Sequence, residues 1–132
     1  TEATAAYIRG EMRTYFRLIQ HSDAWTLFPP YGGEAVRGAD VSEERMDSLE
    51  RMFQGGEASP DIVQAVTSGD LAVITGIERQ HGKVAGFAPQ DWSLRVTLVF
   101  RREDGEWRQI HRHADPLVKG ITMEELSAIA KR

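Results

Sequence analysis

The sequence has 132 residues, of which 41% are apolar and 27% charged, with a net charge of −4 and no cysteine. This length argues for one domain over residues 1–132, and the composition excludes extensive disorder. The lack of cysteine excludes disulfides, thiolate metal sites and cysteine nucleophiles. The acidic balance without a basic tract argues against nucleic-acid binding, and no apolar run is long enough to span a membrane.

Residues 2–20 predict an amphipathic helix. Its apolar side chains recur at helical spacing and form one stripe, made of Ile8, Met12, Tyr15, Phe16 and Ile19. No signal peptide is recognisable here, so we expect a cytoplasmic protein. Because the sequence begins at Thr1, the native N-terminus is left open.

The rest of the chain predicts two short strands, a second helix and three successive hairpins. Ser42 is a typical N-cap for the second helix, and Gly55-Gly56 is expected to end it. Thr122 and Glu125 form a capping box for a last, short helix. The expected elements are strands at 25–28, 34–37, 58–67 and 71–81, two long strands within 91–117, and helices at 43–54 and 122–132. This order indicates an α+β protein with a strongly curved antiparallel sheet.

The order of elements resembles the cone-shaped fold of the nuclear transport factor 2-like superfamily. The segments RVTLVFRREDGEW and RQIHRHADPL resemble the last two strands of its SnoaL-like and ketosteroid isomerase-like members. WTLFPPYGGEAVRG and SGDLAVITGIERQHG resemble an uncharacterised bacterial branch, so the resemblance covers about residues 25–117. It implies a sheet covered by N-terminal helices, a hydrophobic pocket at the wide end of the cone and a homodimer through the outer sheet face.

Isomerases of this superfamily use a carboxylate base and an oxyanion hole built from a tyrosine and a protonated acid. Tyr15 lies on the first expected helix, where such a tyrosine would sit. No acidic pair of this sequence matches the other positions. The resemblance therefore indicates the fold more strongly than the activity.

The face on which a polar row of the last strand lies depends on the preceding turn. Alternation places five side chains of that strand on one face: Trp107, Gln109, His111, His113 and Asp115. A two-residue turn at Asp104-Gly105 would direct the histidines to the core, whereas a three-residue turn that includes Glu103 would direct them outward. We favour the second turn, because Thr97 would then oppose His111, and Arg95 would oppose His113. The row would then lie on the outer face as a subunit interface, since Trp107 and Val99 make that face apolar.

That turn leaves a pocket with an aromatic wall and Arg112 as its charge. Its expected lining is Tyr15, Trp25, Phe28, Tyr31, Trp92 and Leu94. Such a wall would stack on a small, flat, apolar organic ligand. The alternative is that Trp25 and Phe28 belong to the core and that Tyr31 only covers the mouth of the cone.

The histidine row and Glu78 are the candidate catalytic groups. His111 and His113, with Asp115 beside them, could act as a general acid and base, could hold a metal, or could form a purely structural hydrogen-bonded row. No further ligand completes a metal set, so neither a metal nor a cofactor is expected. Arg95 and Arg112 could each bind a carboxylate of a ligand, or could instead pair with Asp115 or Glu78.

Two hypotheses follow. The first is a small-molecule-binding protein that, if it is an enzyme, is a cofactor-independent isomerase, cyclase or hydratase acting by general acid/base chemistry. The second is a non-catalytic binding or dimeric assembly module with the histidine row at its interface. The face occupied by His111 and His113 distinguishes the two.

Overall fold

The computed structural model describes residues 6, 8–9, 11, 18–39 and 42–132. Most of the helix expected at 2–20 therefore lies outside the described residues, including Tyr15. Of the described part, Ala6 and Ile8 are completely buried.

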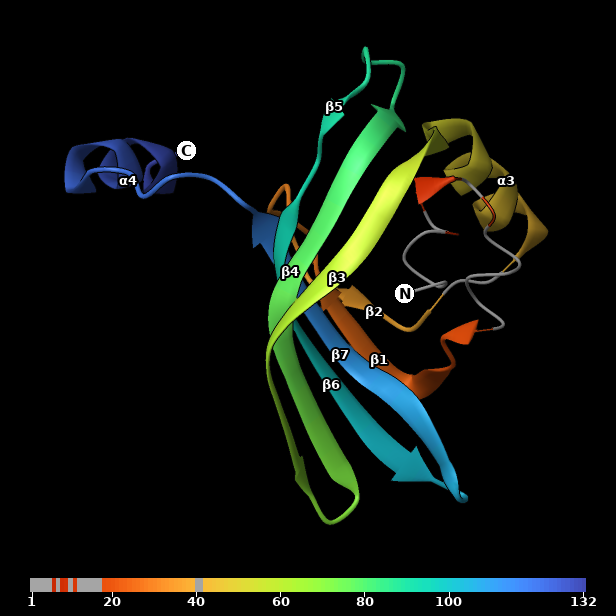
Figure 1. Ribbon diagram of the computed structural model, residues 1–132. Coiled ribbons are helices and arrows are strands. Elements are labelled where there is room, and N and C mark those ends of the chain that lie inside the picture. Colours follow the sequence, from red (N-terminus) through yellow and green to blue (C-terminus); the bar gives the residue numbers. More distant parts are fainter. Residues whose placement is uncertain (1–5, 7, 10, 12–17, 40–41) are drawn as a thin grey trace.

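A curved sheet of seven strands dominates the described chain (Figure 1). With the labels of Figure 1, its strands are β1 His21–Phe28, β2 Val36–Arg37, β3 Phe53–Ser68, β4 Leu71–Val84, β5 Gln90–Asp91, β6 Leu94–Glu103 and β7 Glu106–Pro116. The strand order is β2-β1-β7-β6-β4-β3, with β5 added to β4. Among the described strands, β1 and β7 run parallel and the other pairs are antiparallel. The α+β class and the curved sheet predicted from the sequence are confirmed.

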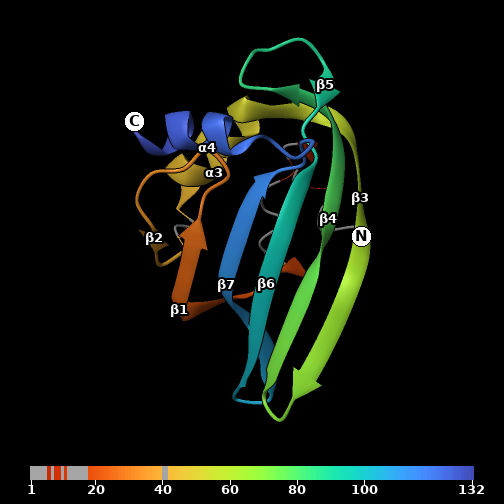
Figure 2. The same cartoon turned by 90° about the vertical axis from the view of Figure 1, so that its left-hand side faces the viewer.

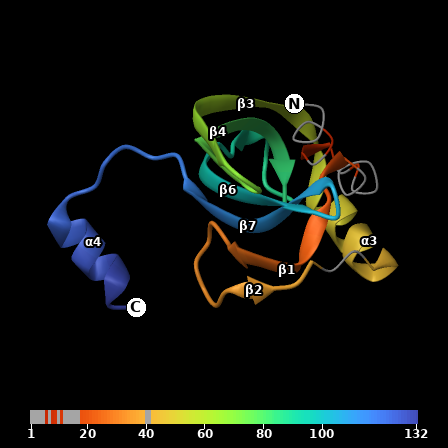
Figure 3. The ribbon, with the colours of Figure 1, turned by 90° about the horizontal axis from the view of Figure 1, so that it is seen from below.

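Two helices of the described chain lie on opposite sides of the sheet. Helix α3 (Glu43–Met52) stands on the concave side, and helix α4 (Met123–Ala130) stands off the other side (Figures 1 and 3). Within the described residues, neither helix combines the length and the apolar content needed to cross a bilayer.

The beginning of α3 agrees with the sequence, but its end does not. The Arg45 backbone N–H donates to Ser42 Oγ at 3.2 Å, so the expected N-cap is confirmed. The helix ends at Met52, and Gly55-Gly56 lie inside β3 instead of ending the helix. A Cβ on Gly56 would lie 2.0 Å from the His81 carbonyl oxygen, so this glycine allows the close approach of β3 and β4.

The turn between β6 and β7 has two residues, so the favoured three-residue turn is wrong. Asp104 and Gly105 both have positive φ, 53° and 80°, as a type I′ turn requires. Glu103 pairs directly with Glu106 across this turn.

A bulge in β7 then shifts the pairing of the strands. Phe100 pairs with Gln109, whereas the preceding Val99 pairs with His111. Ile110 is therefore an extra residue on β7, and side chains on the two sides of a bulge change their alternation. Beyond it, Thr97 pairs with His113.

This bulge divides the polar row between the two faces. Gln109 and Trp107 lie on the concave face with Phe100, so the prediction that five side chains share one face is wrong. His111, His113 and Asp115 lie on the outer face, as expected. They reach it by a bulge rather than by a longer turn. Ala114 and Val96, which are paired on the concave face, are buried, and this identifies the core side.

Candidate functional site

Six side chains with polar groups form a connected set on the concave face of the sheet. They come from three strands that are far apart in the sequence, and the parallel pairing of β1 with β7 brings the first of these strands to the other two (Figure 2). We call them the concave cluster: His21 and Trp25 on β1, Glu78 and Gln80 on β4, and Gln109 and Arg112 on β7.

A bidentate ion pair is the centre of the concave cluster. Arg112 donates through Nη1 to Glu78 Oε2 at 2.8 Å and through Nη2 to Oε1 at 2.7 Å. Both side chains are largely buried, at 18% and 11% exposure. Gln80 Nε2 also donates to Glu78 Oε1 at 3.3 Å. Both carboxylate oxygens of Glu78 therefore already accept charge-assisted hydrogen bonds from Arg112.

An aromatic donor and a neutral imidazole complete the cluster. Trp25 Nε1 donates to Gln109 Oε1 at 2.9 Å, and Gln109 is 2% exposed. The His21 ring meets the Trp25 ring edge-on, with 5.0 Å between centroids. The pKa of His21 is lowered to about 4, mainly by burial. A hydrogen bond with the Ile19 backbone opposes this shift, and the positive charge of Arg112 adds to it. His21 is therefore neutral at pH 7.

A second group of polar side chains lies on the outer face. Thr26 Oγ1 and His111 Nδ1 are 2.7 Å apart, and the Phe28 ring stands edge-on to His111 and His113 at 5.2 Å and 5.4 Å. These contacts tie the histidines to β1 rather than to a carboxylate.

An exposed ion pair lies further along the same face. Arg95 donates to Asp115 at 2.6 Å and 3.1 Å, and these hydrogen bonds raise the pKa of Arg95. This pair lies at a shallow depression of about 360 Å³. Val63, Ile77 and His113 also line the depression.

The structure separates the residues that the sequence proposed as one site. Trp25, Glu78 and Arg112 lie on the concave face, whereas the outer face carries Phe28, Arg95, His111, His113 and Asp115. No acid/base constellation of Glu78 with the two histidines is formed. Among the described residues there is also no group of three or more His, Asp or Glu side chains placed to hold a metal.

Two other aromatic candidates differ in position: Tyr31 is exposed, whereas the Trp92 backbone N–H donates to the carbonyl oxygen of Gln80, a member of the concave cluster, at 2.8 Å. Tyr31 is 88% exposed in the loop after β1. Trp92 donates through Nε1 to the Gly82 carbonyl oxygen at 3.2 Å, and its ring lies 6.1 Å from that of Phe87. Tyr15 lies outside the described residues.

Sequence reasoning did not propose His21, Gln80 or Gln109 as members of a site. Gln80 could have been found, because it alternates with Glu78 on the same strand. Gln109 was assigned to the wrong face, since a bulge leaves no clear sequence signal. His21 follows directly after the helix expected at residues 2–20 and is the first residue of β1.

The chain belongs to the SnoaL-like domain family, whose model matches residues 1–118. This is a branch of the nuclear transport factor 2-like superfamily, as the resemblance implied. No curated protein matches the sequence significantly.

Solved structures agree on the fold. The S. rosetta CaMKII hub has a TM-score of 0.67 at 18% identity, over 87% of this chain and 88% of that chain. A candidate ketosteroid isomerase from Shewanella frigidimarina has 0.65 at 21%, over 86% and 90%. An NTF2-like protein of unknown function from Pseudomonas putida has 0.63 at 20%, over 94% and 84%.

The two arginine pairs should differ sharply in their effect on stability. Arg112→Met leaves the carboxylate of Glu78 largely buried without its partner, so we expect a loss of about 3 kcal/mol in the free energy of unfolding. Glu78→Met/Arg112→Met should recover most of this loss, because no unpaired charge then remains. Arg95→Met is the matched control on the exposed pair and should leave the urea midpoint nearly unchanged. Equal effects of Arg112→Met and Arg95→Met would contradict the assigned faces.

His21 should make the protein less stable in mild acid. Its pKa is about 4 in the folded chain and ordinarily near 6.5, so the unfolded chain takes up the proton first as the pH falls. Its contribution is complete above pH 6.5 and is lost as the pH falls toward 4. Between pH 7 and pH 5 we expect urea unfolding to show about 1–2 kcal/mol less stability, a loss that His21→Gln should not show. An identical pH dependence in both proteins would rule out a neutral, buried His21.

Proposed function

We propose that the protein binds a small, largely apolar organic molecule on the concave face of its sheet, with the concave cluster supplying the polar contacts. One observation carries this: buried Gln80, Gln109 and Glu78 lie where the inner face of a small sheet would ordinarily be apolar. Burying polar groups and ion pairs costs free energy, and apolar replacements are often at least as stable. Because the buried polar groups do not maximise stability, a functional role is a reason for their presence.

The surroundings of the cluster have the character of a ligand site. Apolar side chains of the same face, Leu94, Val96 and Ala114, lie beside the polar groups. Small-molecule sites typically combine apolar walls with a few placed polar groups. The candidate ketosteroid isomerase, with the same fold, adds support for a site in the cone.

The cluster favours binding over catalysis. Glu78 is held at both oxygens by Arg112, and a histidine with a pKa of about 4 is a weak base at neutral pH. His111 and His113 lie on the other face, so they cannot serve a molecule bound in the cone. Any reaction here would be a cofactor-independent proton transfer of the isomerase, cyclase or hydratase kind, and it would use His21 or Glu78.

Ligand binding should depend on the polar groups of Trp25 and Gln80. Benzoate and phenol are suitable probes, one anionic and one neutral, and binding beside Trp25 should change tryptophan fluorescence. Trp25→Phe removes the indole N–H and Gln80→Met removes an amide with little change in volume. Each should weaken binding about tenfold, the effect of one lost hydrogen bond, as measured by calorimetric titration.

His113→Gln is the control, because it changes polarity only on the outer face and should leave the affinity unchanged. If neither probe binds the intact protein, or if His113→Gln weakens binding as much as Gln80→Met does, the concave site is refuted.

A second role, as a dimeric assembly module, is favoured by the outer face. Phe28, Val63, Val66 and Val73 lie on this face and are between 36% and 74% exposed. Exposed apolar side chains gathered on one face of a sheet are typical of interaction surfaces. Similarity to the S. rosetta CaMKII hub and to the association domain of C. elegans CaMKII supports self-association. The two roles are compatible, because they use opposite faces of one sheet.

Val73→Glu should disrupt this dimer, because it would bury an unpaired carboxylate at the centre of the interface. We expect the dissociation constant from sedimentation equilibrium to rise about 100-fold. Val36→Glu is the matched control: Val36 has similar exposure, 39% against 36%, but lies on the short strand β2. Dimerisation that is unchanged by Val73→Glu would refute the outer-face interface.

A further inference from the structure

The last part of the chain carries exposed apolar side chains. We call residues 117–132 the arm. Helix α4 within it has no buried residue, and Met123, Leu126 and Ile129 are 74%, 46% and 57% exposed. Their spacing of three places them along one side of the helix. Val118 and Ile121, in the connector before α4, are also exposed.

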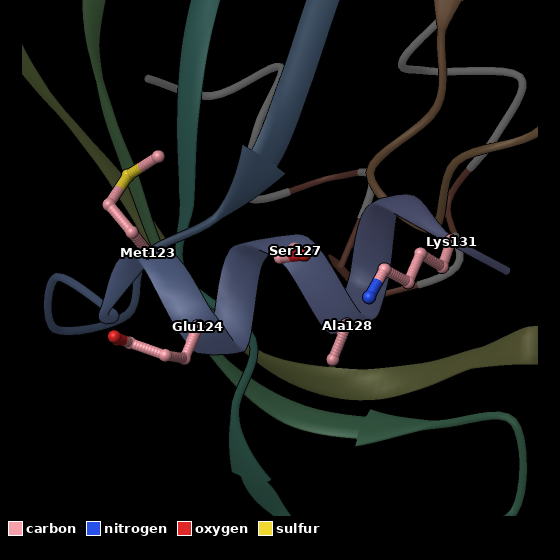
Figure 4. A pocket seen from close by; sticks show the side chains of 5 residues that line it. All are labelled: Met123, Glu124, Ser127, Ala128 and Lys131. Atoms are coloured by element: carbon pink, nitrogen blue, oxygen red, sulfur yellow. The ribbon is translucent and has the colours of Figure 1, made fainter.

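The opposite flank of α4 carries charged and hydroxyl side chains beside one alanine. Figure 4 shows a hollow lined by side chains of α4 and by Lys131, the residue that follows it. Apart from Met123 at one end, its lining consists of Glu124, Ser127, Ala128 and Lys131. The helix is therefore amphipathic, and its apolar side is the one that needs a partner.

Helix α4 is too short to be stable by itself. It has 8 residues, whereas isolated helices below about 12–15 residues are marginal in water. A complete capping box defines its start, because Thr122 Oγ1 accepts from the Glu125 backbone and the Glu125 side chain accepts from the Thr122 backbone. Helix α4 has a defined start and an exposed apolar side, so packing of that side on another protein surface would stabilise it.

The position of the arm indicates which surface that is. Helix α4 stands on the side of the sheet away from α3, which is the side of the exposed outer face (Figures 1 and 3). The connector of residues 117–122 can span about 20 Å when extended. Two sheets packed face to face lie about 10 Å apart, so the connector is long enough to carry α4 across such an interface.

From these observations we propose that the arm of each copy docks, by the apolar side of α4, on a second copy of this chain. The inference rests on the proposed outer-face dimer and extends it. The arm would pack on the partner subunit and cover apolar surface at the edge of the interface. The family match ends at residue 118, so most of the arm lies beyond the SnoaL-like domain itself.

Paired substitutions on the two flanks of α4 test this in the full chain. Leu126→Glu places a charge on the apolar side, and Ala128→Glu places the same charge on the polar flank. Neither side chain is buried, so both variants should fold. We expect Leu126→Glu to raise the dimer dissociation constant about 30-fold in sedimentation equilibrium, and Ala128→Glu to change it less than about threefold. Hydrogen exchange of residues 122–130 in the unmodified protein should slow as the protein concentration rises.

Each other outcome overturns the inference. If Leu126→Glu dimerises normally while Val73→Glu does not, the arm is not part of the interface, although the outer-face dimer stands. If the unmodified protein remains monomeric and α4 is protected at every concentration, the arm folds back on its own chain, and both proposals fail. If the protein is monomeric and α4 is protected only when a vesicle or another protein is added, the partner is not a second copy.

Discussion

One extra residue in β7 determines the chemistry of both faces of the sheet. Without the bulge at Ile110, the tight turn at Asp104-Gly105 would direct His111 and His113 into the concave side. With it, the side chains before the bulge keep one alternation and those after it take the other. Gln109 and Arg112 therefore share the concave face although they are three residues apart, an odd spacing that a regular strand would place on opposite faces.

The concave cluster depends on that arrangement. Gln109 reaches Trp25 and Arg112 reaches Glu78 only because both strand segments direct these side chains to the same side. The ion pair in turn bears on the titration of His21, whose pKa is lowered by burial and by the charge of Arg112. The polar groups of the concave cluster interact with one another, so a substitution at one of them should alter the interactions of the others.

The outer face has the opposite character. Among the described residues, its histidines contact Thr26 and Phe28 and have no carboxylate partner. Arg95 forms an exposed ion pair with Asp115, and Val63, Val66 and Val73 are exposed. This composition suits a surface that is covered by another protein chain better than one that carries out a reaction. In the proposed function, ligand binding would use the concave face and assembly would use the outer face, on whose side α4 stands.

Much of the fold could be predicted from the sequence because it depends on local signals. The Ser42 cap, the capping box at Thr122 and the long strands all appear as expected. The concave cluster could not be predicted to the same degree. The parallel pairing of β1 with β7 joins residues more than 80 positions apart, and the bulge follows no pattern in the residues RQIHRH. Because faces are assigned by counting, one unpaired residue was enough to misplace Trp107 and Gln109.

The register of β6 against β7 in solution is the most direct test of the division of side chains between the two faces. Nuclear Overhauser contacts between backbone protons of opposed residues report the register of the two strands in solution. The account predicts contacts between Phe100 and Gln109 on one side of Ile110, and between Thr97 and His113 on the other. Contacts between Val96 and His113 would mean that no bulge is present. The histidines would then face the cone, and the division of function between the two faces would be wrong.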